Sequence, residues 1–304
     1  MRVCSNILEL TGKTPLVRLN KVTADCPAEV WAKLEMFNPS GSAKARAALG
    51  MILRAEEEGI IKPGWTIIEP TSGNQGIGLA MVGAVRGYRV IVVMPENMSK
   101  ERQQLVKAYG GEVVLSPAGE DLEGAVKLAH KLAAEYQNAW MPDQFNNPSN
   151  PDYHASTTAL EVLEQMPFLD AYVAGVGTGG TLTGVARVIK EKRPEVRVYA
   201  VEPAESAVLS GKEPGKHRIQ GIGDGFIPGN LDVRLLDGVV AVREEEAIEM
   251  MQRLAREEGI LAGISSGAAA VAAIAVGKKL GPDKRVLVIF PDTGERYLSM
   301  GIFG

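Results

Sequence analysis

The chain has 304 residues, of which 45% are hydrophobic and 23% charged, and a formal net charge of −4. This composition suits a globular protein with room for two domains, and the slight acidic balance argues against a nucleic-acid partner because no basic surplus exists to neutralise phosphates. No apolar run reaches the ~18 residues of a membrane span, and the three histidines lack metal-ligand spacing, so we expect no metal site. Cys4 and Cys26 form no CxxC pair, and we expect a cytoplasmic protein in which both thiols are reduced.

Apolar runs of strand length recur along the chain, separated by longer amphipathic stretches. Many of them are continuous runs of valine and isoleucine, which is typical of parallel strands covered on both faces. In chain order, the predicted strands are Val30–Leu34, Thr66–Glu69, Val90–Met94, Val113–Leu115, Ala171–Val176, Val196–Val201, Val239–Val242 and Val286–Phe290.

Helices are predicted between these strands. Their ranges are Arg46–Glu58, Gly76–Arg86, Ser99–Tyr109, Leu122–Glu135, Tyr153–Glu164, Thr181–Glu191, Glu244–Glu258 and Gly267–Lys279. Repeated alternation of strand and helix predicts an α/β fold with mostly parallel sheets flanked by helices.

Two polar segments mark possible domain boundaries. Phe145–Pro151 contains two prolines and lies near the midpoint, and Phe37–Gly41 is a weaker signal of the same kind. We therefore expect residues 40–146 to form a smaller α/β unit, inserted into a larger unit made of residues 1–39 and 147–304.

Two glycine-rich turns, Thr71–Gly76 and Gly177–Thr181, each follow a predicted strand and open a predicted helix. Such a junction directs unpaired backbone N–H groups and the positive end of the helix at one point, where an anionic group binds. Two turns suggest a molecule, or a pair of molecules, with two anionic ends. An amino acid together with a phosphorylated cofactor fits that count.

The second turn suits a compact dianion such as a phosphate monoester. Thr178, Gly179 and Gly180 offer backbone N–H groups, and the hydroxyls of Thr178 and Thr181 add further donors. The alternative is a glycine turn that serves packing only.

The same segment also satisfies a dinucleotide-binding pattern. Gly175, Gly177 and Gly180 fit G-x-G-x-x-G, and Glu202 ends the next predicted strand. An NAD-linked dehydrogenase would leave the other glycine-rich turn and Lys44 without a role, so this interpretation ranks second.

The first turn offers the hydroxyls of Thr71 and Ser72 and the amide of Asn74, an array that suits a carboxylate. The alternative is an ordinary helix cap, although several polar positions in succession exceed what one cap requires.

Lys44 lies in a loop of small residues directly before a predicted helix. We expect the positive helix end and Arg46 to lower the pKa of its amine, which would favour Schiff-base chemistry. An exposed lysine at a helix start is the alternative. Further on, Ser265 and Ser266 precede an alanine-rich helix that must pack closely, so one serine hydroxyl is spare after capping.

Together these segments resemble the cysteine synthase (O-acetylserine sulfhydrylase) family of fold-type II pyridoxal-phosphate enzymes. The resemblance runs nearly end to end, through Gly12–Val17, Asn38–Arg46, Thr71–Gly76, Asp143–Phe145, Asn146–Pro151, Gly177–Gly184, Ile219–Gly223, Gly225–Pro228, Gly263–Ala269 and Gly294–Ser299. It implies a tryptophan synthase β-like fold of two open, twisted, mostly parallel sheets, with a larger cofactor-binding domain and a smaller, mobile domain that closes over the substrate.

The resemblance implies a role for each motif residue toward pyridoxal 5'-phosphate. Lys44 matches the residue that forms the Schiff base, Asn74 the partner of the ring hydroxyl, and Ser265 the partner of the pyridine nitrogen, with Ser266 beside it. The phosphate cup corresponds to Gly177, Thr178, Gly179, Gly180 and Thr181. For the amino-acid substrate, Thr71, Ser72, Asn74 and Gln144 resemble the cradle of the α-carboxylate.

The activity implied is β-replacement on O-acetyl-L-serine with sulfide, through an α-aminoacrylate intermediate, to give L-cysteine. Lys44 would act as the general base at Cα. A serine partner leaves the pyridine nitrogen unprotonated, which favours β-elimination over transamination. The resemblance also implies a homodimer and a possible serine acetyltransferase partner.

Three residues depart from the usual family pattern: Ala45 replaces an aspartate, Gln75 a threonine in the carboxylate cradle, and Asp224 an alanine. Asp224 is expected near the pocket mouth, where it would activate water or bind the ammonium of a second amino acid, unless it is simply a solvated loop acid. Its presence suggests an alternative: cysteine or serine serves as donor, with sulfide release and formation of serine, cystathionine or lanthionine. Ala45 and Gln75 also leave open a binding protein without turnover.

Overall fold

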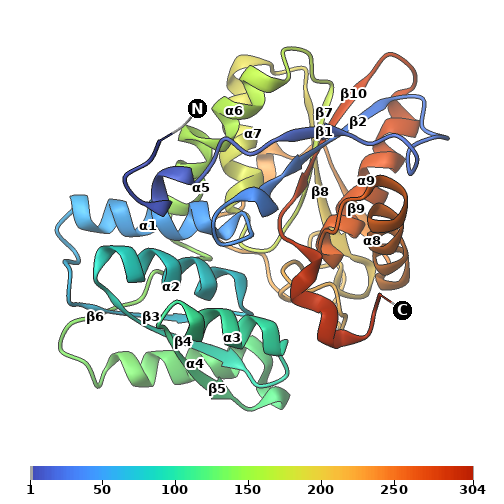
Figure 1. Cartoon of the computed structure of the whole chain (residues 1–304). Coiled ribbons are helices and arrows are strands. Elements are labelled where there is room, and N and C mark those ends of the chain that lie inside the picture. Colours follow the sequence, from blue (N-terminus) through green and yellow to red (C-terminus); the bar gives the residue numbers. More distant parts are fainter. Residues whose placement is uncertain (1–2, 304) are drawn as a thin grey trace.

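The computed structural model describes residues 3–303, whose strands form two separate sheets (Figure 1). The larger sheet has the order β1-β2-β10-β7-β8-β9 and the smaller the order β5-β4-β3-β6. All pairings are parallel except that of β1 with β2. The predicted α/β fold with mostly parallel sheets is confirmed.

The strand bounds follow the predicted runs within two residues at either end. The larger sheet comprises β1 (Leu16–Arg18), β2 (Glu29–Leu34), β7 (Ala171–Gly175), β8 (Arg197–Pro203), β9 (Gly238–Val242) and β10 (Arg285–Phe290); the smaller comprises β3 (Thr66–Pro70), β4 (Arg89–Pro95), β5 (Glu112–Ser116) and β6 (Ala139–Trp140). The edge strands β1 and β6 were not predicted because each is too short to carry a recognisable pattern.

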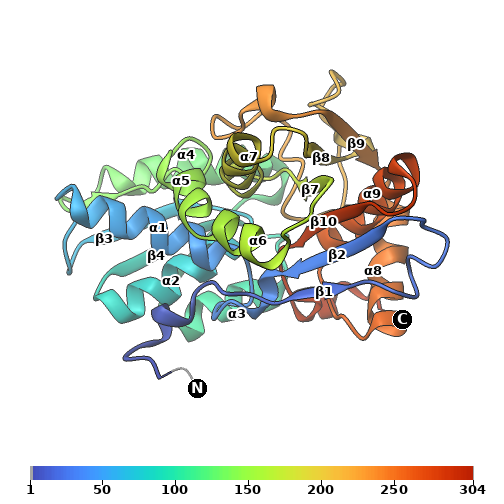
Figure 2. The same ribbon diagram turned by 90° about the horizontal axis from the view of Figure 1, so that it is seen from above.

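The helices flank both sheets (Figures 1 and 2). They are α1 (Lys44–Glu57), α2 (Asn74–Arg86), α3 (Lys100–Ala108), α4 (Asp121–Ala133), α5 (Ser149–Ser156), α6 (Thr158–Gln165), α7 (Gly180–Lys192), α8 (Glu244–Glu258) and α9 (Ile264–Leu280). The single helix predicted over Tyr153–Glu164 is wrong: the backbone leaves the helical region at Thr157, with φ −125° and ψ −74°, which divides α5 from α6.

Alternate residues of the central strands face opposite helical layers. In β10, Val286, Val288 and Phe290 pack with α8 and α9, whereas Leu287 and Ile289 pack with α6 and α7. The smaller sheet likewise has α1, α2 and α3 on one face and α4 on the other. Burial on both faces explains the continuous valine and isoleucine runs in the sequence.

A buried group of charged residues fixes the start of α1 to the larger sheet. The Arg46 guanidinium forms ion pairs of 2.7 Å with Glu35, after β2, and with Glu161, in α6. Lys33, in β2, forms a further pair of 2.8 Å with Glu161. Further along, α1 packs against α2 and α5, so this helix lies between the two sheets.

Candidate active site

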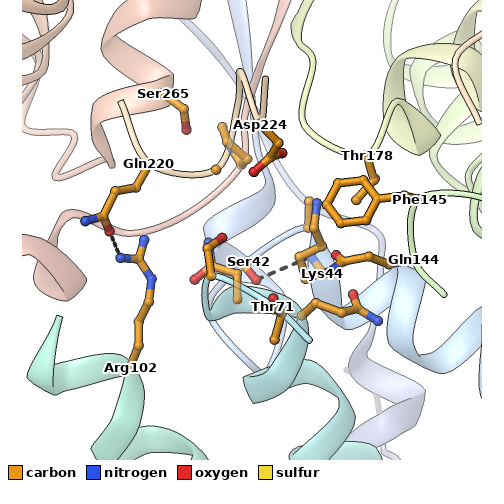
Figure 3. Close-up of a pocket in the computed structure, with 16 residues that line it drawn as sticks. Ser42, Lys44, Thr71, Arg102, Gln144, Phe145, Thr178, Gln220, Asp224 and Ser265 are labelled. Atoms are coloured by element: carbon orange, nitrogen blue, oxygen red, sulfur yellow. Dashed lines mark hydrogen bonds between the residues drawn. The ribbon is translucent and has the colours of Figure 1, made fainter. Parts of the chain in front are cut away.

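Two adjoining cavities lie where the carboxyl ends of β7 and β10 face the N-terminus of α2. Figure 3 shows residues that line the first of them. The space within the two cavities, open solvent included, is about 550 and 480 Å³. Lining residues common to both are Ala43, Lys44, Thr178, Gly221, Ser265 and Pro291. The two cavities therefore form one continuous site around Lys44.

Lys44 is the first residue of α1 and not part of the loop before it. Its backbone N–H donates to Ser42 Oγ at 3.3 Å, and the Ala43 N–H donates to the Pro291 carbonyl at 2.8 Å, so the end of β10 holds this turn in place. Burial lowers the pKa of the Lys44 amine, while the carboxylates of Asp224 and Asp292 act in the opposite direction.

The predicted influence of Arg46 on Lys44 is wrong. The Arg46 guanidinium is directed away from the cavity, into its ion pairs with Glu35 and Glu161. Loss of hydration, not a neighbouring cation, is therefore the cause of the lowered Lys44 pKa.

The second glycine-rich turn follows β7 and opens α7. Gly179 has φ +77°, and a Cβ there would lie 2.9 Å from the Leu231 backbone nitrogen; a Cβ at Gly177 would lie 2.3 Å from the Gly221 carbonyl oxygen. Gly177, Thr178, Gly179 and Thr181 line the second cavity, whereas Gly180 packs against Asn150 behind it. This turn has the geometry expected of an anion cup at a helix N-terminus.

The acidic residue of the dinucleotide pattern has another function in the fold. The Glu202 carboxylate accepts hydrogen bonds from the backbone N–H groups of Leu209 and Ser210 and from the Ser210 hydroxyl, at 2.5 to 3.1 Å. Glu202 is buried and hydrogen-bonded within this turn, so it is not available to bind the ribose of a dinucleotide. This argues against the dehydrogenase interpretation.

The first glycine-rich turn borders the same site from the smaller sheet. Thr71, Ser72, Asn74, Gln75 and Gln144 all line the first cavity. The Gln75 side chain is fully buried, and neither its amide oxygen nor its amide nitrogen has a hydrogen-bond partner. A buried amide without partners is costly, and a ligand or an ordered water in this cavity would supply them.

Gln144 is positioned by a buried acid that sequence reasoning missed. The backbone N–H groups of Asp143 and Gln144 both donate to Glu69, each at 3.2 Å, and Asp143 adopts a left-handed φ of +53°. Burial raises the pKa of Glu69 to about 8. Glu69 directly follows a run of isoleucines in β3, and no sequence signal connects it with residues 143–144.

The Asn74 amide is hydrogen-bonded at both ends. Its nitrogen donates to Asp292 Oδ2 at 2.7 Å, and its oxygen accepts from Arg296. Tyr297 donates to the same Asp292 oxygen at 2.8 Å. Each end keeps one unused site, a second N–H and a second oxygen lone pair, through which Asn74 could bond a cofactor hydroxyl.

Arg102, from α3, is a second lining residue that the sequence did not reveal. It is 2% exposed, its guanidinium lies over the Tyr297 ring, and it donates to Gln220, between β8 and β9 (Figure 3). A Cβ at Gly73 would lie 2.1 Å from Arg102 Cδ, so the Arg102 side chain can occupy this position only because residue 73 is a glycine. These contacts join α3 to the far side of the site.

Asp224 lines the first cavity near Lys44 (Figure 3). Burial raises the pKa of its carboxyl, and the charges of Lys44 and His217 oppose the effect. The interpretation of Asp224 as a freely solvated loop acid is therefore wrong. Beside it, Ser265 lines both cavities, whereas Ser266 lines neither and is fully buried, which favours Ser265 as the spare hydroxyl.

Within residues 3–303, no group of three or more histidine, cysteine, aspartate or glutamate side chains could hold a metal ion. In the same part of the chain, no helix is long and apolar enough to cross a membrane.

Comparison with known proteins assigns this fold and site to a class. Residues 7–292 match the family model described as pyridoxal-phosphate dependent enzyme. A cysteine synthase of Staphylococcus aureus is 52% identical over 300 residues, covering 98% of this chain and 96% of that protein. The chain therefore belongs to the cysteine synthase family of pyridoxal-phosphate dependent enzymes.

Solved structures agree with this assignment. The cysteine synthase of Entamoeba histolytica superimposes with a TM-score of 0.95 at 41% identity, over 99% of this chain and 91% of that one. A hydrogen sulfide-producing enzyme from Fusobacterium nucleatum gives a TM-score of 0.94 at 41% identity, over 97% and 100% of the two chains.

The residues present fit pyridoxal 5'-phosphate, the cofactor of this family. The turn at Gly177–Thr181 keeps its shape because its glycines pack too closely against Gly221, Leu231 and Asn150 to carry a Cβ, and its backbone N–H groups at the start of α7 suit a phosphate. Lys44 and Ser265 each border both cavities, so an amine and a hydroxyl flank the space beside the cup. A phosphate ester, an aldehyde and a ring nitrogen each have a partner of suitable chemistry here.

Proposed function

We propose that this enzyme catalyses β-replacement on O-acetyl-L-serine with sulfide, giving L-cysteine and acetate. The observation that carries this proposal is the position of Lys44, between the anion cup and the carboxylate turn in one continuous site. The similarity to cysteine synthases over nearly the whole chain supports the same reaction.

Residues of this chain would hold the cofactor at three points. The amides of Gly177–Thr181 would bind its phosphate, the Ser265 hydroxyl would donate to its ring nitrogen, and the Lys44 amine would attach it covalently. When bound, pyridoxal phosphate supplies an electron sink for negative charge at the substrate Cα.

The substrate carboxylate accepts hydrogen bonds from Thr71, Ser72 and Gln144, which fixes the Cα–H bond toward Lys44. Because burial lowers its pKa, the freed Lys44 amine is neutral in a larger fraction of molecules and takes the Cα proton. The Cβ–O bond breaks and acetate leaves, hydrosulfide forms the new Cβ–S bond, and Lys44 returns the proton to Cα.

We also propose that residues 40–146 form a smaller domain that closes over the substrate, against a larger cofactor-binding domain of residues 1–39 and 147–304. The separate four-stranded sheet supports this division. Arg102 and Asn74 bond across the site to Gln220 and Asp292, and such contacts would help to exclude water from the reacting centre.

Assembly and location follow from the family resemblance. We propose that the enzyme acts on its amino-acid substrate as a cytoplasmic homodimer and that a serine acetyltransferase is a possible partner. Sedimentation velocity of the purified enzyme, alone and with the acetyltransferase of the same organism, tests both points.

The activity is tested with purified enzyme, pyridoxal phosphate, O-acetyl-L-serine and sulfide, with cysteine as the measured product. Lys44→Ala should abolish turnover, whereas Lys62→Ala, which removes an exposed lysine from the same region, should not. Failure of the wild type to release acetate or form cysteine would refute the proposal and favour a binding protein without turnover.

A second candidate reaction is supported by Asp224. A carboxyl group partly buried beside Lys44 is suited to activate water or to bind a second amino acid, and a structural neighbour is a hydrogen sulfide-producing enzyme. In this reaction cysteine or serine is the donor, and serine, cystathionine or lanthionine is the product. If Asp224→Ala leaves the products formed from cysteine unchanged, this candidate is refuted.

A further inference from the structure

Helix α5 lies directly behind the phosphate cup. Its residues Asn150 and His154, four positions apart and so on one face, are each 1% exposed. The helix contacts α7 closely, because a Cβ at Gly184 would lie 2.2 Å from the Pro151 carbonyl oxygen and a Cβ at Gly180 would lie 2.1 Å from Asn150 Oδ1. Two glycines of α7 thus allow α5 to reach the cup.

Asn150 determines whether the Thr178 hydroxyl oxygen donates or accepts a hydrogen bond on the side of α5. The Asn150 amide nitrogen donates to the Gln144 carbonyl at 2.9 Å and to Thr178 Oγ1 at 3.1 Å. A carbonyl can only accept, so the amide orientation is fixed and Thr178 Oγ1 is an acceptor. The Gly180 N–H approaches the same oxygen at 3.5 Å. Within the described residues no acceptor binds the hydrogen of the Thr178 hydroxyl, so this hydrogen can point into the cavity.

His154 contacts the other hydroxyl of the cup. Its Nε2 lies 3.1 Å from Thr181 Oγ1, and its Nδ1 lies 2.8 Å from Thr158 Oγ1. Burial lowers the pKa of His154 to about 3, with the charge of Arg46 acting in the same direction, so the ring is neutral and carries one hydrogen. With that hydrogen on Nε2, the ring donates to Thr181 and leaves the Thr181 hydrogen free for the cup.

We propose that Asn150 and His154 are positioning residues that direct the Thr178 and Thr181 hydroxyl hydrogens into the cup, with His154 in its Nε2–H form. Both hydroxyls then donate to the phosphate held there. The inference rests on the assignment of this cup to the cofactor phosphate and not on the identity of the reaction.

The test compares the affinities of the cofactor-free full-length protein for pyridoxal phosphate and for pyridoxal, which lacks the phosphate. Hydrogen bonds to charged groups are the stronger ones, so we expect Asn150→Leu and His154→Leu each to weaken pyridoxal phosphate binding about tenfold or more. Pyridoxal binding should be unchanged. His154→Gln, whose amide nitrogen can donate like Nε2, should recover part of the loss.

Asn230 provides a matched control for Asn150. Its amide nitrogen donates to the same Gln144 carbonyl, at 2.8 Å, but among the described residues it forms no hydrogen bond with Thr178. Asn230→Leu should therefore leave the ratio of the two affinities unchanged. In a Thr178→Ala background, Asn150→Leu should have no further effect on that ratio. An unchanged ratio in both α5 variants, or an equal effect of Asn230→Leu, would overturn the proposal.

A second measurement determines the protonation of the His154 ring in the wild-type enzyme directly. The chain has three histidines, so nitrogen-15 NMR of histidine-labelled holoenzyme resolves each ring. We expect a neutral ring with hydrogen on Nε2 for His154, assigned by loss of its signals in His154→Gln. Hydrogen on Nδ1 would overturn the inference. An enzyme that shows these results but forms no cysteine would refute the proposed function alone.

Discussion

Replacement of Glu69 by glutamine should remove a pH dependence from the stability of the protein. Glu69 is 1% exposed, and burial raises its pKa from 4.5 to about 8, with the Asp143 carboxylate acting in the same direction. Between these values the folded protein holds a proton that the unfolded chain has released. Folding stability is then lost as the pH rises toward 8.

The size of the effect follows from this difference. One proton changes the free energy of unfolding by about 1.4 kcal/mol per pH unit, so the wild type should lose about 2.5 kcal/mol between pH 5.5 and 7.5 through Glu69. Glu69→Gln keeps one acceptor for the backbone of residues 143–144 but cannot ionise. Its unfolding free energy relative to the wild type should therefore rise by about 2.5 kcal/mol over that range.

Guanidinium unfolding at pH 5.5, 6.5 and 7.5 measures this difference, at a fixed concentration of pyridoxal phosphate. Tryptophan fluorescence reports on it, because Trp65 and Trp140 lie at the smaller sheet. Glu135→Gln, at an exposed position, controls for the loss of one negative charge. A difference between Glu69→Gln and wild type that stays constant from pH 5.5 to 7.5 would refute the reasoning.

Three further substitutions test the framework of the site. Arg46→Met leaves the buried Glu35 carboxylate without its ion-pair partner and should lower the unfolding free energy by about 3–5 kcal/mol. The exposed Arg54→Met should change it by about 0.5 kcal/mol or less, and thermal melts that show equal losses would contradict this. Gln75→Leu removes an unpartnered amide and should stabilise the substrate-free protein by about 1–3 kcal/mol. It should also raise KM for the amino acid. A lower melting temperature of the variant would argue against a role of the Gln75 amide in binding the ligand. Gly179→Ala should weaken pyridoxal phosphate binding more than Gly110→Ala, which shares a positive φ but meets no neighbour; equal affinities in a fluorescence titration would count against the cup.

Sequence patterns predicted the strands well because each central strand is buried on both faces and therefore contains a continuous run of apolar residues. The same reasoning failed for β1 and β6, which are too short for a pattern, and for Thr157, where a local backbone break has no distinctive residue type. The glycine-rich turns were recognisable because close backbone contacts exclude every side chain at Gly177 and Gly179.

The supporting residues of the site could not be found in this way. Asp292, Arg102 and Glu69 reach the cavity region from three distant segments, and only the fold brings them to Asn74 and Gln144. A charge close in sequence was also misleading: Arg46 stands two positions from Lys44, yet a helix directs the two side chains differently. Spacing along the chain does not reveal such convergence through space.

The anchoring of α1 determines which part of the enzyme can move. Lys44 falls within residues 40–146 by sequence, but the bond from Ala43 to Pro291 and the ion pair of Arg46 with Glu35 attach it mechanically to the six-stranded sheet. If the proposed smaller domain closes over the substrate, its hinge must therefore lie beyond the first turn of α1. Under that proposal the reactive amine would stay stationary while the carboxylate turn moves, so selectivity for the amino acid could evolve on the moving side without disturbing the base.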